Sequence, residues 1–186
     1  MLGPAPVASQ VDHALAFGRA LAARPPPRAL DLGSGGGIPG LVLASRWPET
    51  RWVLLDGQAR RVVFLQAAIV RLGLADRVQA VHARAEDAGR DQRWRASFGL
   101  VTSRSFGPPA IVAECGAPFL QVGGQLVVSE PPGSRGGRWP AAGVAPVGLT
   151  LERTTSDPSF AVLRQETLCP DGYPRRPGVP QRRPLF

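Results

Sequence analysis

A glycine-rich segment near the start of the chain is its first candidate binding site. Residues 31–37 read Asp-Leu-Gly-Ser-Gly-Gly-Gly and follow a short apolar run. Glycine tolerates positive φ and lets a ligand approach the backbone closely, so such a turn at a strand end can hold a small molecule. A dinucleotide-binding turn would follow the pattern Gly-x-Gly-x-x-Gly, but Ile38 stands where its last glycine belongs. The spacing leaves two alternatives, a turn that binds another kind of ligand and a tight structural turn.

Acidic residues follow the next two apolar runs. Asp56 ends the run RWVLLD, and Glu86 and Asp87 come after the run RVQAVHA. A carboxylate at the end of a second strand can accept hydrogen bonds from both ribose hydroxyls of an adenosine ligand, although aspartate is also a common helix N-cap. Either Glu86 or Asp87 can accept from the adenine 6-amino group, or can cap the following helix instead. The pattern favours an adenosine-containing ligand.

The glycine-rich segment resembles motif I of methyltransferases that use S-adenosylmethionine (SAM), with the pattern Asp-x-Gly-x-Gly-x-Gly. SAM has no pyrophosphate, and an acidic residue at the strand end suits its charged methionine end. The resemblance therefore makes SAM the expected cofactor. The residues expected to bind it are Asp31, Gly33, Ser34, Gly35, Gly37, Asp56, Gly57, Ala85, Glu86 and Arg104.

The fourth apolar run is followed by Arg104, Ser105 and Phe106. We expect Arg104 to project into the same crevice, where its guanidinium can pair bidentately with the SAM carboxylate or with a substrate phosphate. The alternative is an ordinary surface arginine. Many methyltransferases have Asn-Pro-Pro-Tyr at this place to hold an exocyclic amine, and this chain does not. Methylation of adenine N6 or of a glutamine amide is therefore disfavoured.

The order of apolar and amphipathic segments predicts an α/β fold. We expect strands at 28–33, 51–56, 77–83, 98–103 and 124–130, and helices at 9–23, 38–47, 58–72 and 109–121. Residues 147–154 and 159–167 should form an antiparallel hairpin that turns at 156–158. Pro39 is expected in the first turn of its helix. The side chains expected to face the sheet from 58–72 are Val62, Phe64, Leu65, Ile69 and Leu72.

These elements predict a Rossmann-like class I SAM methyltransferase, with a mostly parallel seven-stranded sheet that ends in an antiparallel hairpin. We expect one domain over residues 1–186, with an N-terminal helix and linker at 1–27 and a Pro/Arg-rich tail without regular structure at 170–186. Ligands of such sheets bind outside the carboxyl ends of the strands. The loop at 131–146 should lie beside that crevice, either as a mobile lid or as an idle loop.

The chain has 22 basic and 14 acidic residues, which give a net charge of +8. Every basic residue is arginine, so chemistry that needs a Schiff-base lysine, a P-loop lysine or a lysine base is excluded. The positive charge suggests a nucleic-acid partner, although the codon bias of a GC-rich genome also enriches arginine. The spacing of Cys115 and Cys169 predicts no zinc site.

No membrane span and no secretory signal are expected, because long apolar runs and a basic N-terminal segment are missing from the sequence. We therefore expect a reducing, cytoplasmic compartment.

Six segments occur in the order found in the RsmG/GidB family of 16S rRNA guanine-N7 methyltransferases. They are DLGSGGGIPGLVLA, LLDGQARRVVFLQ, RAED, SRSF, GGQLV and YPRRPGVPQRRPL, and the resemblance spans residues 9–186. It implies a SAM pocket that includes Gly33, Gly35, Asp56, Ala85 and Glu86, with Arg104 as the catalytic residue at the reaction centre. It also implies that an arginine-rich tail contacts cofactor or rRNA through Arg175, Arg176, Arg182 and Arg183. The expected partner is 16S rRNA or the 30S subunit, and the expected state is a monomer.

The chemistry of this reaction agrees with the residues present. Guanine N7 has a free lone pair and needs no deprotonation, so orientation and electrostatics matter more than a general base. His13 and His82 are accordingly expected to be packed or surface histidines.

Two features depart from the family. Its members begin with a longer helical region, and they end the fifth strand in Lys-Gly, where this chain has Glu130 before two prolines. A carboxylate that faces an rRNA phosphate would be repulsive. Two alternatives follow: a methyltransferase that acts on another nucleobase or a small molecule, and a SAM- or RNA-binding module without catalysis.

Overall fold

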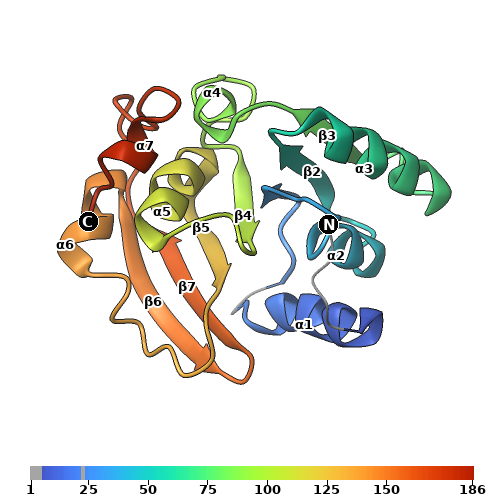
Figure 1. Ribbon diagram of the computed structural model, residues 1–186, viewed down its shortest axis with the longest axis horizontal. Coiled ribbons are helices and arrows are strands. Elements are labelled where there is room, and N and C mark those ends of the chain that lie inside the picture. The colour runs from blue at the N-terminus through green and yellow to red at the C-terminus, as the bar shows by residue number, and fades with distance from the viewer. Residues whose placement is uncertain (1–5, 22–23) are drawn as a thin grey trace.

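The computed structural model describes residues 6–21 and 24–186, and its centre is a seven-stranded sheet of order β3-β2-β1-β4-β5-β7-β6 (Figure 1). The strands β1 to β5 are parallel, β7 is antiparallel to β5, and β6 is antiparallel to β7. This arrangement confirms the predicted sheet with its terminal hairpin. The strands are β1 Arg28–Leu32, β2 Arg51–Asp56, β3 Val78–His82, β4 Phe98–Ser103, β5 Leu120–Ser129, β6 Leu149–Ser156 and β7 Ser159–Gln165.

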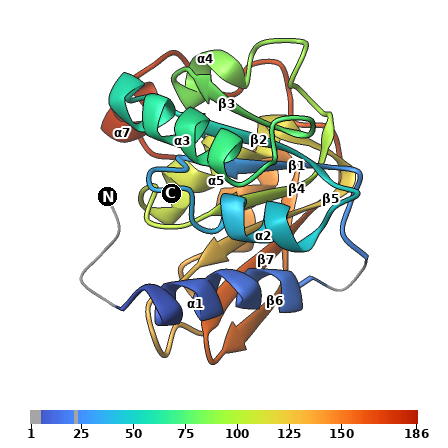
Figure 2. The ribbon, with the colours of Figure 1, turned by 90° about the vertical axis from the view of Figure 1, so that its right-hand side faces the viewer.

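Helices cover both faces of the sheet. On one face α1, α2 and α3 pack against alternate strand residues such as Ala29 and Trp52 (Figure 2). On the other face residues of α4, α5 and α6 belong to one core cluster with Leu30 and Val53. This alternation is the period of two that a strand imposes on its side chains. The helices are α1 Val7–Arg19, α2 Gly40–Arg46, α3 Ala59–Arg71, α4 Ala85–Ala88, α5 Pro109–Gly116, α6 Ala141–Val144 and α7 Val179–Arg182.

The prediction for α3 was partly wrong. Val62, Leu65 and Ile69 are buried as expected, because they recur at the spacing of one helix face. Phe64 and Leu72 were expected to face the sheet, but they are 45% and 53% exposed. Phe64 lies beside the buried stripe, and Leu72 follows the last helical residue.

Three further differences from the prediction involve a proline. Pro39 precedes α2 rather than lying in its first turn. The helix expected over 109–121 ends at Gly116, and a 3₁₀ turn at Ala117–Phe119 contains Pro118, which lacks the N–H that an α-helix interior needs. The tail was expected to have no regular structure, but it contains α7, in which Pro180 occupies the first turn.

The helix expected over 9–23 begins two residues earlier, at Val7, and ends at Arg19. Residues 22 and 23 of that prediction lie outside the described residues. Between residues 6 and 186, gaps aside, no described helix has the length and apolar character that a membrane crossing needs.

Candidate active site

Two cavities adjoin at the carboxyl ends of the parallel strands, and Ser105 and Phe106 line both of them. The first cavity, of about 310 Å³, lies between the ends of β1, β2 and β3; its lining residues are Gly33, Asp56, Gly57, Gln58, Arg61, Arg84, Ala85, Glu86, Ser105, Phe106, Ile111 and Gln181. The second cavity, of about 330 Å³, lies between the ends of β4 and β5; its lining residues are Ser103, Ser105, Phe106, Gly107, Pro109, Val112, Val128, Ser129, Glu130, Pro131, Arg138 and Trp139.

The turn after β1 depends on glycine at the wall of the first cavity. Gly33 has a φ of +69°, and a Cβ there would lie 2.5 Å from the Phe106 ring. A larger residue would therefore strain the backbone and displace the ring that separates the two cavities.

Asp31 holds this turn from inside the protein. Its side chain accepts hydrogen bonds from the Ser34 hydroxyl, the Gly40 backbone N–H at 3.1 Å and the Thr102 hydroxyl at 2.7 Å. Burial raises the pKa of this carboxyl, and the three hydrogen bonds oppose the rise. Asp31 is 1% exposed and lines neither cavity.

Asp56 occupies the wall of the first cavity, where sequence reasoning expected an acceptor for ribose. Its Oδ2 accepts from the Gly35 backbone N–H at 2.8 Å and its Oδ1 from that of Gln58 at 2.9 Å. Arg61 lies 3.5 Å from Oδ2. These contacts fix the carboxylate and tie the turn after β1 to the start of α3.

The two acidic residues after β3 have different surroundings: Glu86 lines the first cavity, whereas Asp87 is exposed. The Oε1 atom of Glu86 accepts from Arg84 at 2.9 Å, from the Gly178 backbone N–H at 3.3 Å and from the Gln181 amide at 3.3 Å. Burial raises the pKa of this carboxyl, but these hydrogen bonds outweigh it and leave the pKa below its usual value. The tail therefore closes one side of the first cavity.

Arg104 lies beside the two cavities, and it lines neither of them. Its guanidinium donates to the Gln10 side-chain oxygen on α1 at 2.7 Å. Burial lowers the pKa of Arg104, and the charge of Asp31 opposes this shift.

Both histidines are placed as expected. His13 packs against the rings of Phe17 and Phe160, and burial, followed by the nearby charge of Arg104, lowers its pKa. His82 is exposed at the end of β3. Neither ring lines either of the two cavities described above, so neither is placed as a general base there.

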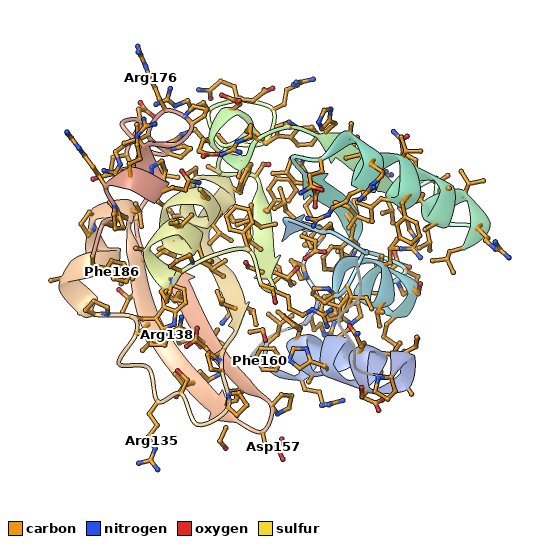
Figure 3. The ribbon with its side chains drawn as sticks, in the orientation of Figure 1. Arg135, Arg138, Asp157, Phe160, Arg176 and Phe186 are labelled. Carbon is orange, nitrogen blue, oxygen red and sulfur yellow. The ribbon has the colours of Figure 1, made fainter. Side chains whose placement is uncertain are left out.

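Of the four arginines in the tail, one is paired with a buried carboxylate and three have exposed side chains. Arg175 forms a two-point ion pair with Glu114, which is fully buried, and it also donates through its backbone N–H. Arg176, Arg182 and Arg183 are exposed, and Arg176 points away from the protein (Figure 3). Arg175 thus attaches the tail to α5, and the other three remain available to a polyanion.

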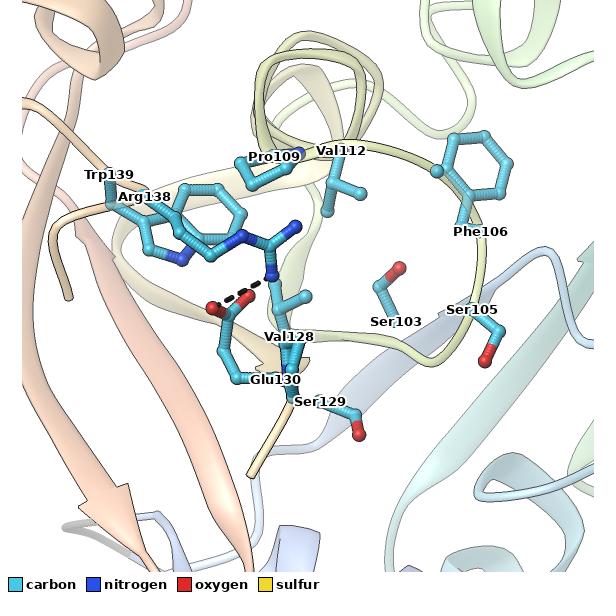
Figure 4. A pocket seen from close by; sticks show the side chains of 12 residues that line it. Ser103, Ser105, Phe106, Pro109, Val112, Val128, Ser129, Glu130, Arg138 and Trp139 are labelled. Carbon is cyan, nitrogen blue, oxygen red and sulfur yellow. Dashed lines mark hydrogen bonds and ion pairs between the residues drawn. The ribbon is translucent and has the colours of Figure 1, made fainter. Parts of the chain in front are cut away.

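Glu130, the carboxylate expected to repel an rRNA phosphate, is paired with a positive charge inside the protein. Glu130 is buried, and its Oε2 accepts from Ser134 at 2.7 Å. The same oxygen accepts from Arg138 at 3.0 Å (Figure 4). The loop at 131–146 supplies both partners, so it places a positive charge against the carboxylate and is fixed to β5 by the same contacts. Sequence reasoning missed this pair because the spacing of Glu130 and Arg138 in a loop has no characteristic pattern.

Several lining residues were missed by sequence reasoning. Gln58 and Arg61 follow Asp56 in the chain, and Ser105 and Phe106 follow Arg104, so their neighbours were the available signal. Ile111 and Gln181 had no such signal, because each reaches the first cavity only through the packing of α5 and α7. Of the ten expected cofactor-binding residues, five line the first cavity: Gly33, Asp56, Gly57, Ala85 and Glu86.

Comparison with known proteins shows the family of the chain. The family model GidB, described as rRNA small subunit methyltransferase G, matches residues 12–130. Ribosomal RNA small subunit methyltransferase G of Moorella thermoacetica is 35% identical in an alignment of 184 residues that covers 94% of this chain and 76% of that protein. Its counterpart in Pelotomaculum thermopropionicum is 36% identical in an alignment of 169 residues that covers 84% of this chain and 69% of that protein.

A solved structure supports the fold. The SAM-dependent methyltransferase of Geobacter sulfurreducens, in complex with S-adenosylhomocysteine, matches with a TM-score of 0.54 and 26% identity over 65% of this chain and 48% of that one. The predicted fold class is thereby confirmed.

Proposed function

The chain belongs to the GidB family of rRNA small subunit methyltransferases, and we propose that it transfers a methyl group from SAM to N7 of a guanine in 16S rRNA. The observation that carries this proposal is the pair of adjoining cavities at the carboxyl edge of the sheet. One cavity has the lining that an adenosine ligand needs, the other is open to an acceptor base, and Phe106 borders both.

The residues of the first cavity fit SAM. Gly33 brings backbone to the cavity wall and makes room for the Phe106 ring, and the fixed carboxylate of Asp56 offers acceptors for ribose hydroxyls. Glu86 offers an acceptor for the adenine amino group, beside Gly57 and Ala85. When bound there, SAM supplies an electrophilic methyl group. Asp31, Ser34, Gly35 and Gly37 support the site by shaping the turn after β1.

Arg104 is proposed to bind the methionine carboxylate of SAM. It follows β4 at the edge that carries both cavities, and its partner Gln10 is a neutral side chain. A carboxylate is a stronger partner for a guanidinium than an amide oxygen, because both groups are charged and two parallel hydrogen bonds form. Arg104 would thus exchange Gln10 for the cofactor.

The acceptor needs no base in this site. The lone pair of guanine N7 is free at neutral pH, and the enzyme contributes by aligning it with the methyl group and excluding water. His13 agrees with this, because its ring packs against Phe17 and Phe160 and lines neither of the two cavities.

The partner proposed is the small ribosomal subunit or its 16S rRNA, bound in the cytoplasm by a monomer. Arg176, Arg182 and Arg183 support this, since they are exposed on the tail that also closes the first cavity. Exposed arginines bind RNA phosphates and displace counterions.

Transfer of tritium from methyl-labelled SAM to purified small subunits tests the proposal. We expect label in the rRNA with the wild-type enzyme and a loss of at least about tenfold in rate with Arg104→Ala, from removal of a charge-assisted contact. Binding of SAM without any transfer to rRNA would favour a non-catalytic module. Transfer only to a small molecule or to another RNA would favour the diverged methyltransferase.

A further inference from the structure

The second cavity contains a carboxylate with one free oxygen, and we propose that Glu130 recognises the Watson–Crick edge of the acceptor guanine. This inference rests on the function proposed above. The Glu130 side chain is 2% exposed, and Ser134 and Arg138 both donate to its Oε2. Within residues 6–21 and 24–186 no donor reaches its Oε1. This oxygen is therefore available to a ligand in the cavity that Glu130 lines.

Guanine is the base that complements such an acceptor. Its N1–H and its 2-amino group are adjacent donors on one edge, and an ionised carboxylate only accepts. Adenine has an acceptor at N1 and no 2-amino group, so it would offer the carboxylate a weaker edge. Hydrogen bonds to a charged acceptor are stronger than those between neutral groups, and the guanidinium of Arg138 balances the charge of Glu130.

Two further buried groups in this cavity point to a polar ligand. The Ser103 hydroxyl and the Trp139 indole N–H are buried, and neither has a hydrogen-bond partner among the described residues (Figure 4). Buried polar groups are almost always paired, because an unpaired one costs free energy. Both can donate to the acceptors of a purine, O6 and N3, while Glu130 accepts from its donors.

This assignment also orients the base. The 2-amino group of guanine lies diagonally across the ring system from N7. A guanine held by this edge at Glu130 therefore turns N7 toward Ser105 and Phe106, which form the wall shared with the first cavity. The carboxylate at the end of β5 thus contacts the base and not a phosphate.

A substitution that changes only the charge tests the proposal. Glu130→Gln keeps the size of the side chain, and Glu166→Gln, at the exposed end of β7, is the matched control. The substrates are small subunits reconstituted with rRNA that carries guanosine or inosine at the methylated position, since inosine lacks only the 2-amino group. Binding of SAM, measured by calorimetry, checks that each variant is folded.

The wild type should prefer guanosine over inosine by about 10- to 100-fold in kcat/KM, which is the usual effect of a hydrogen bond to a charged group. E130Q should lose a similar factor on guanosine, with a guanosine-to-inosine ratio near one and unchanged SAM binding. The Glu166 variant should match the wild type. A purely structural role of Glu130 would lower both rates and leave their ratio unchanged.

A wild-type ratio near one, or a full preference for guanosine in E130Q, would overturn this proposal. If E130Q fails to bind SAM, Glu130→Asp replaces it in the experiment. Its carboxylate lies one methylene farther from the base, so the preference for guanosine over inosine should be lost in the same way. If the wild type methylates neither substrate, the proposed function fails instead, so the two failures are distinct.

Discussion

Asp31 and Asp56 both lie at the carboxyl edge of the sheet, but they have different partners. Asp31 accepts hydrogen bonds from Ser34, Gly40 and Thr102 and is enclosed by the protein. Asp56 is fixed by backbone N–H groups and borders the first cavity. The type and spacing of these residues predicted that both aspartates belong to the cofactor site. The hydrogen bonds of Asp31 show that it supports the turn, whereas the place of Asp56 on the cavity wall lets it meet a ligand.

Substitution of these aspartates by asparagine should therefore affect different properties. Asp31→Asn should lower the free energy of unfolding by about 1–3 kcal/mol, because its amide NH₂ would face a donor in a buried place. Asp56→Asn should weaken SAM binding by about tenfold or more through loss of a charged acceptor. Urea unfolding and calorimetric titration with SAM measure the two effects. Asp87→Asn, on the surface, is the control, and equal loss of SAM affinity in all three variants would contradict the assignment.

At the scale of elements, α2 packs directly against β1 and β2 through Gly40. A Cβ at this position would lie 2.5 Å from the Leu54 side chain and 2.8 Å from a carboxylate oxygen of Asp31. Gly40→Ala should therefore destabilise the protein by about 1–3 kcal/mol, as overpacking of a core does. Chemical denaturation checks this against Gly172→Ala, a position with open space around it. Equal stability of the two variants would show that α2 moves away at little cost.

The tail helix α7 is held against α4 by Glu86, whose hydrogen bonds lower its pKa below the ordinary value of 4.5. Such a group stabilises the folded state fully above pH 4.5, and the stabilisation is lost as pH falls through the lowered pKa. The difference in unfolding free energy between the wild type and Glu86→Gln should therefore narrow as the pH falls from 7 to 3. A stability difference that stays constant over this range would contradict the linkage.

Strand positions could be predicted from sequence because buried parallel strands appear as short apolar runs, as in RWVLLD, which matches β2 residue for residue. The docking of the tail could not, since Gln181 and Glu86 are 95 positions apart and meet only after the sheet has formed. Glu130 was correctly placed at the end of β5, but its neutralisation by Arg138 depends on the path of an irregular loop.

Across the whole molecule, the net charge of +8 can attract RNA to the two cavities only where arginines are exposed near them. Arg175 does not meet this condition, because Glu114 already neutralises it. Arg176, Arg182 and Arg183 do meet it.

Replacement of Arg176, Arg182 and Arg183 by glutamine should flatten the salt dependence of rRNA binding. Loss of three phosphate contacts lowers the slope of log K against log salt by about 2–3. Filter binding at several salt concentrations measures it. A matched triple variant of Arg19, Arg46 and Arg71, which are exposed on α1, α2 and α3, should keep the wild-type slope. Equal slopes in both triple variants would show that the tail does not contact RNA.

If the first cavity presents a methyl donor to guanine N7 in the second, the modified atom identifies both cavities. The deciding measurement is nucleoside analysis of 16S rRNA after small subunits that lack the modification are incubated with the enzyme and SAM. We expect 7-methylguanosine at close to one per subunit. A methyl group on another atom or base, or no methylated nucleoside despite SAM binding, would rule out this arrangement.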